Sequence, residues 1–150
     1  MAKKTENSKS GLGMAHNNHF THQKIQFTIY GNYLKKFKDI NILAETKLSD
    51  DKPIICPDIS IWENVHMHKD IDPENPLVTI EITYTKKNDN YSEDVILDAF
   101  SRYPSIHESF IYNFETDVWT RYRRENGEVV KEEEQDYSQV LRCWLHTLLK

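Results

Sequence analysis

Two short segments of the 150-residue chain decide its fold, Pro57-Asp58-Ile59-Ser60-Ile61 and Leu77-Val78-Thr79-Ile80-Glu81-Ile82-Thr83. In each segment apolar and polar residues alternate, which is the pattern of a β-strand with one buried face. Each segment also carries one carboxylate, Asp58 or Glu81, whose burial without a partner would cost several kcal/mol. Two such acids on adjacent strands can share Mg²⁺ or Mn²⁺, which prefer oxygen ligands. The alternative is that both acids are solvent-facing residues of one-sided strands.

The flanking sequence predicts further strands and helices. Apolar residues recur at helical spacing from about 18 to 38, and again from about residue 91 to 103, where Ser92 is the expected N-cap. The last segment, 138–149, also has a helical pattern, and residues 63–75 are expected to form a polar loop. Period-two patterns predict strands at 40–44, 54–62, 77–84, 109–114, 118–124 and 128–132. This order predicts an α/β fold with a central mixed β-sheet flanked by helices.

Length and composition predict one domain, residues 14–150, preceded by a disordered tail at residues 1–13. Hydrophobic residues make up 38% of the chain and charged residues 29%, which fits a folded domain. The chain contains neither an apolar stretch of membrane-spanning length nor a secretory signal, so a cytoplasmic protein without a membrane partner is expected. Cys56 and Cys143 are expected to be buried free thiols.

The net charge of −5 is spread unevenly along the chain. Residues 1–50 carry +4, residues 51–100 carry −7, and residues 101–150 carry −2. An acidic middle beside a basic first third fits a metal site next to a basic groove, and it fits equally an ordinary solvated acidic surface.

The order and spacing of the motifs resemble the PD-(D/E)XK nuclease superfamily. Pro57-Asp58 is followed by Glu81 within Val78–Thr83, then by Pro104-Ser105-Ile106-His107-Glu108-Ser109-Phe110-Ile111-Tyr112, and then by Val118-Trp119-Thr120-Arg121-Tyr122-Arg123. The chain is more closely similar to a restriction-endonuclease-like family of unknown biological role that is abundant in cyanobacteria. This resemblance covers roughly residues 20–149.

The resemblance implies a restriction-endonuclease-like fold and hydrolysis of DNA phosphodiester bonds with Mg²⁺ or Mn²⁺. Asp58, Glu81 and the backbone carbonyl of Ile82 would hold the metal. The superfamily usually has a lysine two residues after the glutamate, and this chain has Thr83 there.

The missing lysine leaves other residues as candidates. Lys86 and Lys87, just past the strand, would supply the positive charge, and His22 and Thr83 would lie at the periphery of the site.

Four basic residues are candidates for contact with nucleic acid: Lys24, Arg121, Arg123 and Arg124. The three arginines share a predicted strand with Trp119 and Tyr122, a composition that suits either nucleic acid or a second subunit. The resemblance implies a homodimer. Two functions follow, a metal-dependent nuclease or a catalytically impaired nuclease-fold domain that binds DNA or a protein.

Overall fold

The computed structural model describes the backbone of residues 2–37, 40–63 and 75–150, and side-chain burial from residue 18 onward except at Ile40. The helices are α1 (Ala2–Lys36), α2 (Lys86–Arg102) and a 3-10 helix, η1 (Leu145–Leu149). The strands are β1 (Ile40–Ala44), β2 (Ile59–Glu63), β3 (Val78–Thr83), β4 (Glu108–Asn113), β5 (Val118–Glu125), β6 (Glu128–Glu133), β7 (Tyr137–Ser138) and β8 (Cys143–Trp144).

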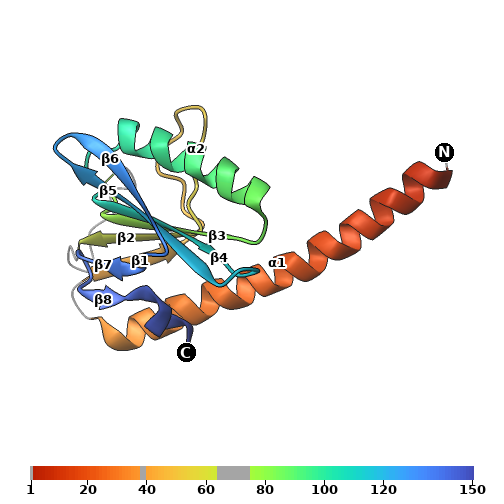
Figure 1. The fold of residues 1–150 in the computed structure, drawn as a ribbon, viewed down its shortest axis with the longest axis horizontal. Coiled ribbons are helices and arrows are strands. Elements are labelled where there is room, and N and C mark those ends of the chain that lie inside the picture. The colour runs from red at the N-terminus through yellow and green to blue at the C-terminus, as the bar shows by residue number, and fades with distance from the viewer. Residues whose placement is uncertain (1, 38–39, 64–74) are drawn as a thin grey trace.

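Six strands form one mixed sheet in the order β1-β2-β3-β4-β5-β6. Neighbouring strands are antiparallel except for β3 and β4, which are parallel and joined through α2. Parallel strands need such a crossover, whereas antiparallel strands can be joined by short turns. The predicted α/β fold with a central mixed sheet flanked by helices is therefore confirmed (Figure 1).

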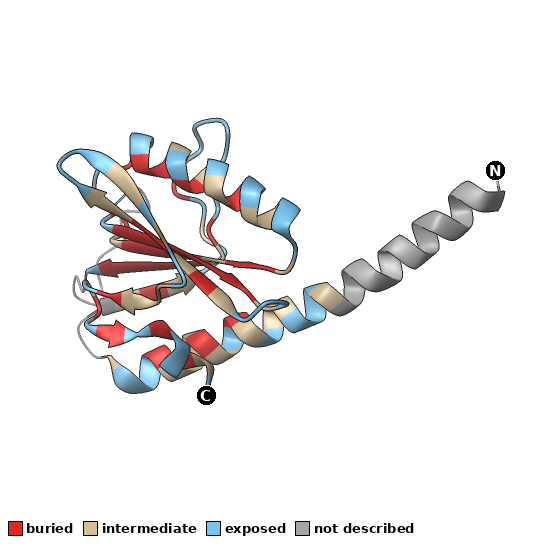
Figure 2. Cartoon of the chain, in the orientation of Figure 1, coloured by how far each residue is buried: buried red, intermediate tan, exposed pale blue. Residues whose placement is uncertain are grey.

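The two helices cover opposite faces of the sheet (Figure 1). Ile29 and Tyr33 of α1 pack with Ile59 and Ile80 of the sheet, together with residues of the C-terminal segment, which runs from Tyr137 to Lys150. On the other face, the core contains Ile96, Ala99 and Phe100 of α2 with Leu48, Ile55, Trp62, Ile111 and Tyr122. Buried residues therefore line the sheet on both sides, as Figure 2 shows.

The first helix differs from the prediction at its beginning. It starts at Ala2, well before the expected start near residue 18, and includes residues 2–13, which the sequence predicts to belong to a disordered tail. No proline interrupts residues 2–36, and Gly11 and Gly13 each weaken a helix by only about 1 kcal/mol. Of the described helices, none has the length and apolar composition needed to cross a membrane.

The second helix begins before Ser92, so the prediction of Ser92 as its N-cap is wrong. It starts at Lys86, and Thr85 is its N-cap, with extended backbone and a hydroxyl that accepts from the Asn88 N–H at 3.0 Å. Ser92 is instead buried inside the helix. The first turns of α2 carry polar residues, so apolar periodicity alone misses them.

The last segment is not the predicted continuous helix but a short β-ribbon, β7 and β8, followed by η1. Two local features interrupt a helix in this segment. The Ser138 hydroxyl accepts from the Leu141 N–H, and Arg142 has a φ of 55° that interrupts a right-handed helix. Strand β2 is also shorter than predicted at its start: it begins at Ile59, and residues 54–58 lie outside it. The predicted loop at 63–75 falls mostly outside the described residues.

The observed start of α2 can be tested by two matched substitutions. Thr85→Ala removes the N-cap acceptor and is expected to lower the free energy of unfolding by about 1 kcal/mol. Ser92→Ala, inside the helix, is expected to change it by less than about 0.5 kcal/mol. Urea unfolding followed by circular dichroism measures both, and a larger loss for Ser92→Ala would contradict this start.

Candidate active site

The register of β2 and β3 brings Asp58 and Glu81 together. Ile59 pairs with Ile80, and one further step along the same antiparallel register places Asp58 opposite Glu81. Opposite residues of an antiparallel pair have Cβ atoms about 5 Å apart. We call Asp58 and Glu81 the acid pair.

The Asp58 carboxylate is held in place by two donors that both bind its Oδ2 atom. The backbone N–H of Ile82 donates to Oδ2 at 2.7 Å, and Nε2 of His22 lies 3.0 Å from the same oxygen. The backbone carbonyl of Asp58 accepts from the Gln26 amide at 2.7 Å and from the Glu45 N–H at 3.1 Å. These contacts fix the orientation of Asp58, and neither side-chain contact uses Oδ1.

The carboxyl of Glu81 is a poor place for a negative charge. Burial raises the pKa of Glu81 well above 4.5, and the charge of Asp58 and a hydrogen bond with its side chain raise it further. A backbone hydrogen bond from Asp58 lowers it in part. Two carboxylates side by side cannot both ionise cheaply, so this pair either retains a proton or needs a cation.

His22 comes from α1, on the opposite face of the sheet from α2. Its hydrogen bond with Asp58 raises the pKa of the imidazole above 6.5, with smaller contributions from the charges of Asp58 and Glu45, while burial lowers it. The predicted peripheral residue therefore contacts one member of the acid pair directly. Its Nδ1 atom is buried and has no hydrogen-bond partner among the residues that the structure describes.

Three neighbours of the acid pair were missed in the sequence: Glu45, Lys47 and Cys56. Cys56 is an exposed residue, but partial desolvation of its sulfur raises the pKa of the thiol, as do the charges of Glu45, Glu81 and Asp58, whereas Lys47 lowers it. The β1–β2 register continues past the strand ends, because Glu45 N–H bonds to Asp58 O and Leu48 N–H to Ile55 O. That continued register, which places Lys47 opposite Cys56, is the signal that could have found them. Both cysteines are free as expected, but only Cys143 is buried.

Among the described residues, no hydrogen bond or ion pair joins the acid pair to Thr83, predicted to lie at its periphery, or to the two lysines predicted to supply a positive charge. Thr83, two residues after Glu81, is buried and donates to Asp89 Oδ1, and the other oxygen of Asp89 accepts from Asn113 at 3.0 Å. Lys86 lines a hollow of about 240 Å³ over β4–β6. Lys87 is exposed, and neither lysine side chain forms an ion pair or hydrogen bond within the described part of the chain.

The donor set of the acid pair fits a hard divalent cation. A strand residue's N–H and C=O point to the same side, so the Ile82 carbonyl faces the side of Asp58 to which its N–H donates. Two carboxylates and a backbone carbonyl are the oxygen donors that Mg²⁺ and Mn²⁺ accept, with waters completing the shell. Within residues 18–37, 40–63 and 75–150, however, no three His, Cys, Asp or Glu side chains converge as a ready-made metal cluster.

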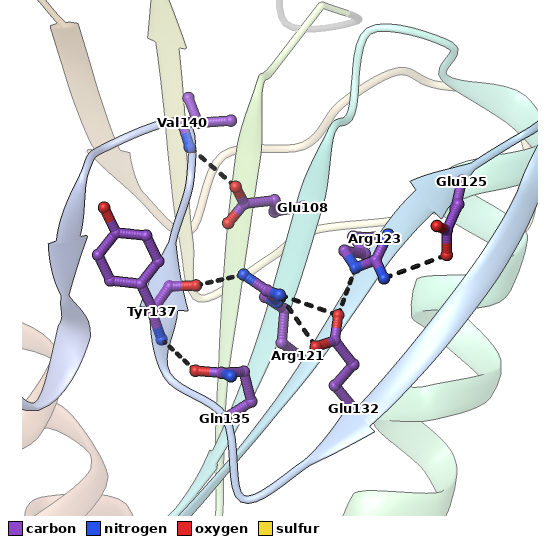
Figure 3. A network of polar contacts seen from close by, with 8 residues as sticks. All are labelled: Glu108, Arg121, Arg123, Glu125, Glu132, Gln135, Tyr137 and Val140. Carbon is purple, nitrogen blue, oxygen red and sulfur yellow. Dashed lines mark hydrogen bonds and ion pairs between the residues drawn. The ribbon is translucent and has the colours of Figure 1, made fainter.

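The three arginines predicted to contact nucleic acid are used inside the protein, as Figure 3 shows for two of them. Arg121 is buried, donates to the Tyr137 carbonyl at 2.7 Å and pairs with Glu132 at 2.9 Å. Arg123 pairs with Glu132 and with Glu125.

Arg124 donates to three backbone carbonyls, those of Phe100, Tyr103 and Ile106, and lies over the Phe100 ring. These contacts differ from the predicted role of the arginines and tie β5 to β6, α2 and the C-terminal segment. Of the predicted nucleic-acid contacts, only Lys24 on α1 has an exposed side chain without a polar partner among the described residues.

Comparison with known proteins supports the fold. No protein-family model and no curated protein matches the chain. Among solved structures, it is similar to a protein from Anabaena variabilis described as a "putative nuclease belonging to DUF820". The TM-score is 0.55 at 15% sequence identity, and the match covers 85% of this chain and 79% of the other. At this identity the likeness shows the fold alone, a nuclease-like α/β architecture.

The raised pKa of Glu81 predicts a pH-dependent stability. Native Glu81 keeps its proton above pH 4.5, where the unfolded chain loses it, so stability falls as pH rises from about 4.5 through the native pKa. The fall in the free energy of unfolding amounts to about 1.4 kcal/mol for each unit by which the native pKa exceeds the unfolded one. Glu81→Gln should abolish it. Urea unfolding with EDTA between pH 4.5 and 8 measures it. Parallel stability curves for the two proteins would contradict the assignment.

The internal role of the arginines predicts a stability order. Arg121→Met leaves the buried Tyr137 carbonyl without its donor and Glu132 with Arg123 alone, and should lower the free energy of unfolding by about 2 kcal/mol. Arg123→Met should cost less, because this guanidinium is more exposed. Denaturant unfolding ranks the two, and the reverse order would show that Arg121 does not anchor the C-terminal segment.

Proposed function

We propose that this protein is a divalent-metal-dependent nuclease that hydrolyses DNA phosphodiester bonds at the acid pair. The observation that carries the proposal is the apposition of Asp58 and Glu81, because burial and mutual charge make two ionised carboxylates there unfavourable unless a cation is bound. The nuclease-like fold shared with the Anabaena variabilis protein supports it. Asp58, Glu81 and the Ile82 carbonyl would hold Mg²⁺ or Mn²⁺.

When bound, the cation would generate hydroxide from a water and neutralise charge that develops on the phosphate. The chain's own residues prepare the site for this chemistry. His22 and the Ile82 N–H fix Asp58 through Oδ2, which keeps Oδ1 free of both contacts. Glu81 would exchange its proton for the cation, which removes the unfavourable pairing of two carboxyl groups.

A second candidate function is a binding module on the same fold, with hydrolysis lost. The observation that favours it is Thr83, which occupies the place of the usual lysine and is bonded to Asp89 rather than pointing free. Lys86 and Lys87, the other candidates for that charge, make no contact with the acid pair among the described residues. Such a protein would bind DNA or a protein without cutting.

Cleavage of supercoiled plasmid and of single-stranded DNA with Mg²⁺ or Mn²⁺ separates the two functions. The wild type is expected to cut, and Glu81→Gln or Asp58→Asn should slow cutting at least about a hundredfold, since a bound metal supplies several kcal/mol of transition-state stabilisation. EDTA should abolish it.

Asp50→Asn is the matched control, because Asp50 is an acid of the same region with its side chain 92% exposed. It should cut like the wild type. Equal cutting by Glu81→Gln would reveal a contaminating nuclease. Absence of cutting by all proteins, with DNA binding retained, would overturn the nuclease and leave the binding module.

A further inference from the structure

Helix α1 presents an uncovered apolar row on the side away from the sheet. Phe20, Phe27 and Leu34 are 68%, 67% and 55% exposed, whereas Ile29 and Tyr33 of the same helix are fully buried. The three exposed residues are spaced by seven, so successive members differ by only about 20° around the helix. We call them the outer row. Apolar residues at heptad spacing are typical of a helix that packs against another helix.

The outer row is symmetric about its central residue. In two antiparallel copies of α1 related by a two-fold axis at Phe27, Phe27 faces Phe27 of the copy, and Phe20 faces Leu34. A surface that matches itself under a two-fold axis is what an isologous dimer requires. Gly31 lies beside the row, and a Cβ built on it meets nothing within 4 Å, so a neighbouring helix can approach closely there.

The apolar area of the row suits a small homodimer interface. A buried aromatic side chain covers about 150–250 Å², so the exposed parts of the three residues amount to about 350 Å² per helix and roughly 700 Å² for the pair. A specific interface buries about 1,200 Å² or more, of which about 65% is apolar in homodimers. The row supplies nearly all of that apolar share.

The charges of α1 fit this arrangement at moderate salt. Residues 18–36 contain three lysines, Lys24, Lys35 and Lys36, and no acidic residue. Around the two-fold axis, Lys24 faces Tyr30 and Lys35 faces His19, so no lysine lies directly opposite another lysine. The pair still brings six positive charges together, and salt should screen their repulsion.

We propose that the outer row of α1 is the interface of a homodimer, in which two α1 helices pack antiparallel around a two-fold axis at Phe27. The proposal does not depend on the nuclease function. It assigns a second copy of this chain to the exposed side of α1.

Sedimentation of the full chain tests the dimer directly. The wild type is expected at twice the 17.8 kDa of one chain, with association that strengthens as salt rises. Phe27→Asp places two carboxylates at the axis and should raise the dimer dissociation constant about thirtyfold or more. Leu97→Asp, at a residue 43% exposed on α2, is the matched control and should leave it unchanged.

Disulfide trapping tests the orientation of the helices, in a Cys56→Ser background that removes the exposed thiol. Phe27→Cys should link to itself on oxidation. Phe20→Cys should not, because its two copies lie about 21 Å apart along an antiparallel pair. A mixture of Phe20→Cys and Leu34→Cys chains should link to each other.

Three results would overturn the proposal: a monomeric wild type, a dimer that Phe27→Asp leaves intact, or self-linking of Phe20→Cys, which would indicate parallel helices. A monomeric wild type whose affinity for single-stranded DNA falls with Phe27→Ala would assign the row to nucleic acid instead.

Discussion

The register between β2 and β3 is the constraint around which the candidate site is built. It sets Asp58 opposite Glu81 at the point where β2 begins, and backbone pairing of the sheet keeps them there. Two neighbouring carboxyl groups repel when both are ionised, so the fold accepts an unfavourable contact at this point. Conflicts of this kind between local physics and the fold are expected at functional sites.

The surroundings of Asp58 offset part of that conflict. The Ile82 N–H comes from the neighbouring strand, His22 and Gln26 come from α1, and the Glu45 N–H comes from the end of β1. Three separate parts of the chain therefore meet at one aspartate. A solvent-facing residue of a one-sided strand does not need such support. These contacts therefore argue against the alternative that Asp58 is merely a solvent-facing strand residue.

The sequence predicts the strands well because alternation reports directly on which side chains face the core. It predicts Asp58 and Glu81 as a pair for the same reason, since an acid inside an alternating apolar run is conspicuous. The contact between His22 and Asp58 is different, because it joins a helix and a strand end that are far apart in the chain. No spacing rule reaches across that separation.

The arginines show how composition alone can leave out contacts within the protein. Strand β5 carries three arginines beside aromatic residues, which is the composition of a nucleic-acid surface. The guanidinium groups of Arg121 and Arg124, however, donate hydrogen bonds to backbone carbonyls of the protein itself. The apolar spacing of the C-terminal segment predicts a helix. In the structure the segment is instead held against β5, where Arg121 donates to the Tyr137 carbonyl. Composition and periodicity describe one segment at a time, and both of these outcomes depend on another segment.

Thr83, two residues after Glu81, directs its hydroxyl to Asp89 and brings no ammonium group to the acid pair. The Thr83 hydroxyl and the Asn113 amide both donate to Asp89, in the first turn of α2. Asp89 therefore ties the start of this helix to β3 and β4. A lysine at position 83 would break this connection. The basic side chain in contact with the acid pair is instead His22, through Asp58, whereas the charge of Lys47 reaches the neighbouring Cys56. His22 already occupies Oδ2, and Lys47 is exposed and paired with Asp50 at 3.0 Å. Charge compensation at Glu81 therefore depends on a proton or a bound cation rather than on a fixed side chain of the chain described here.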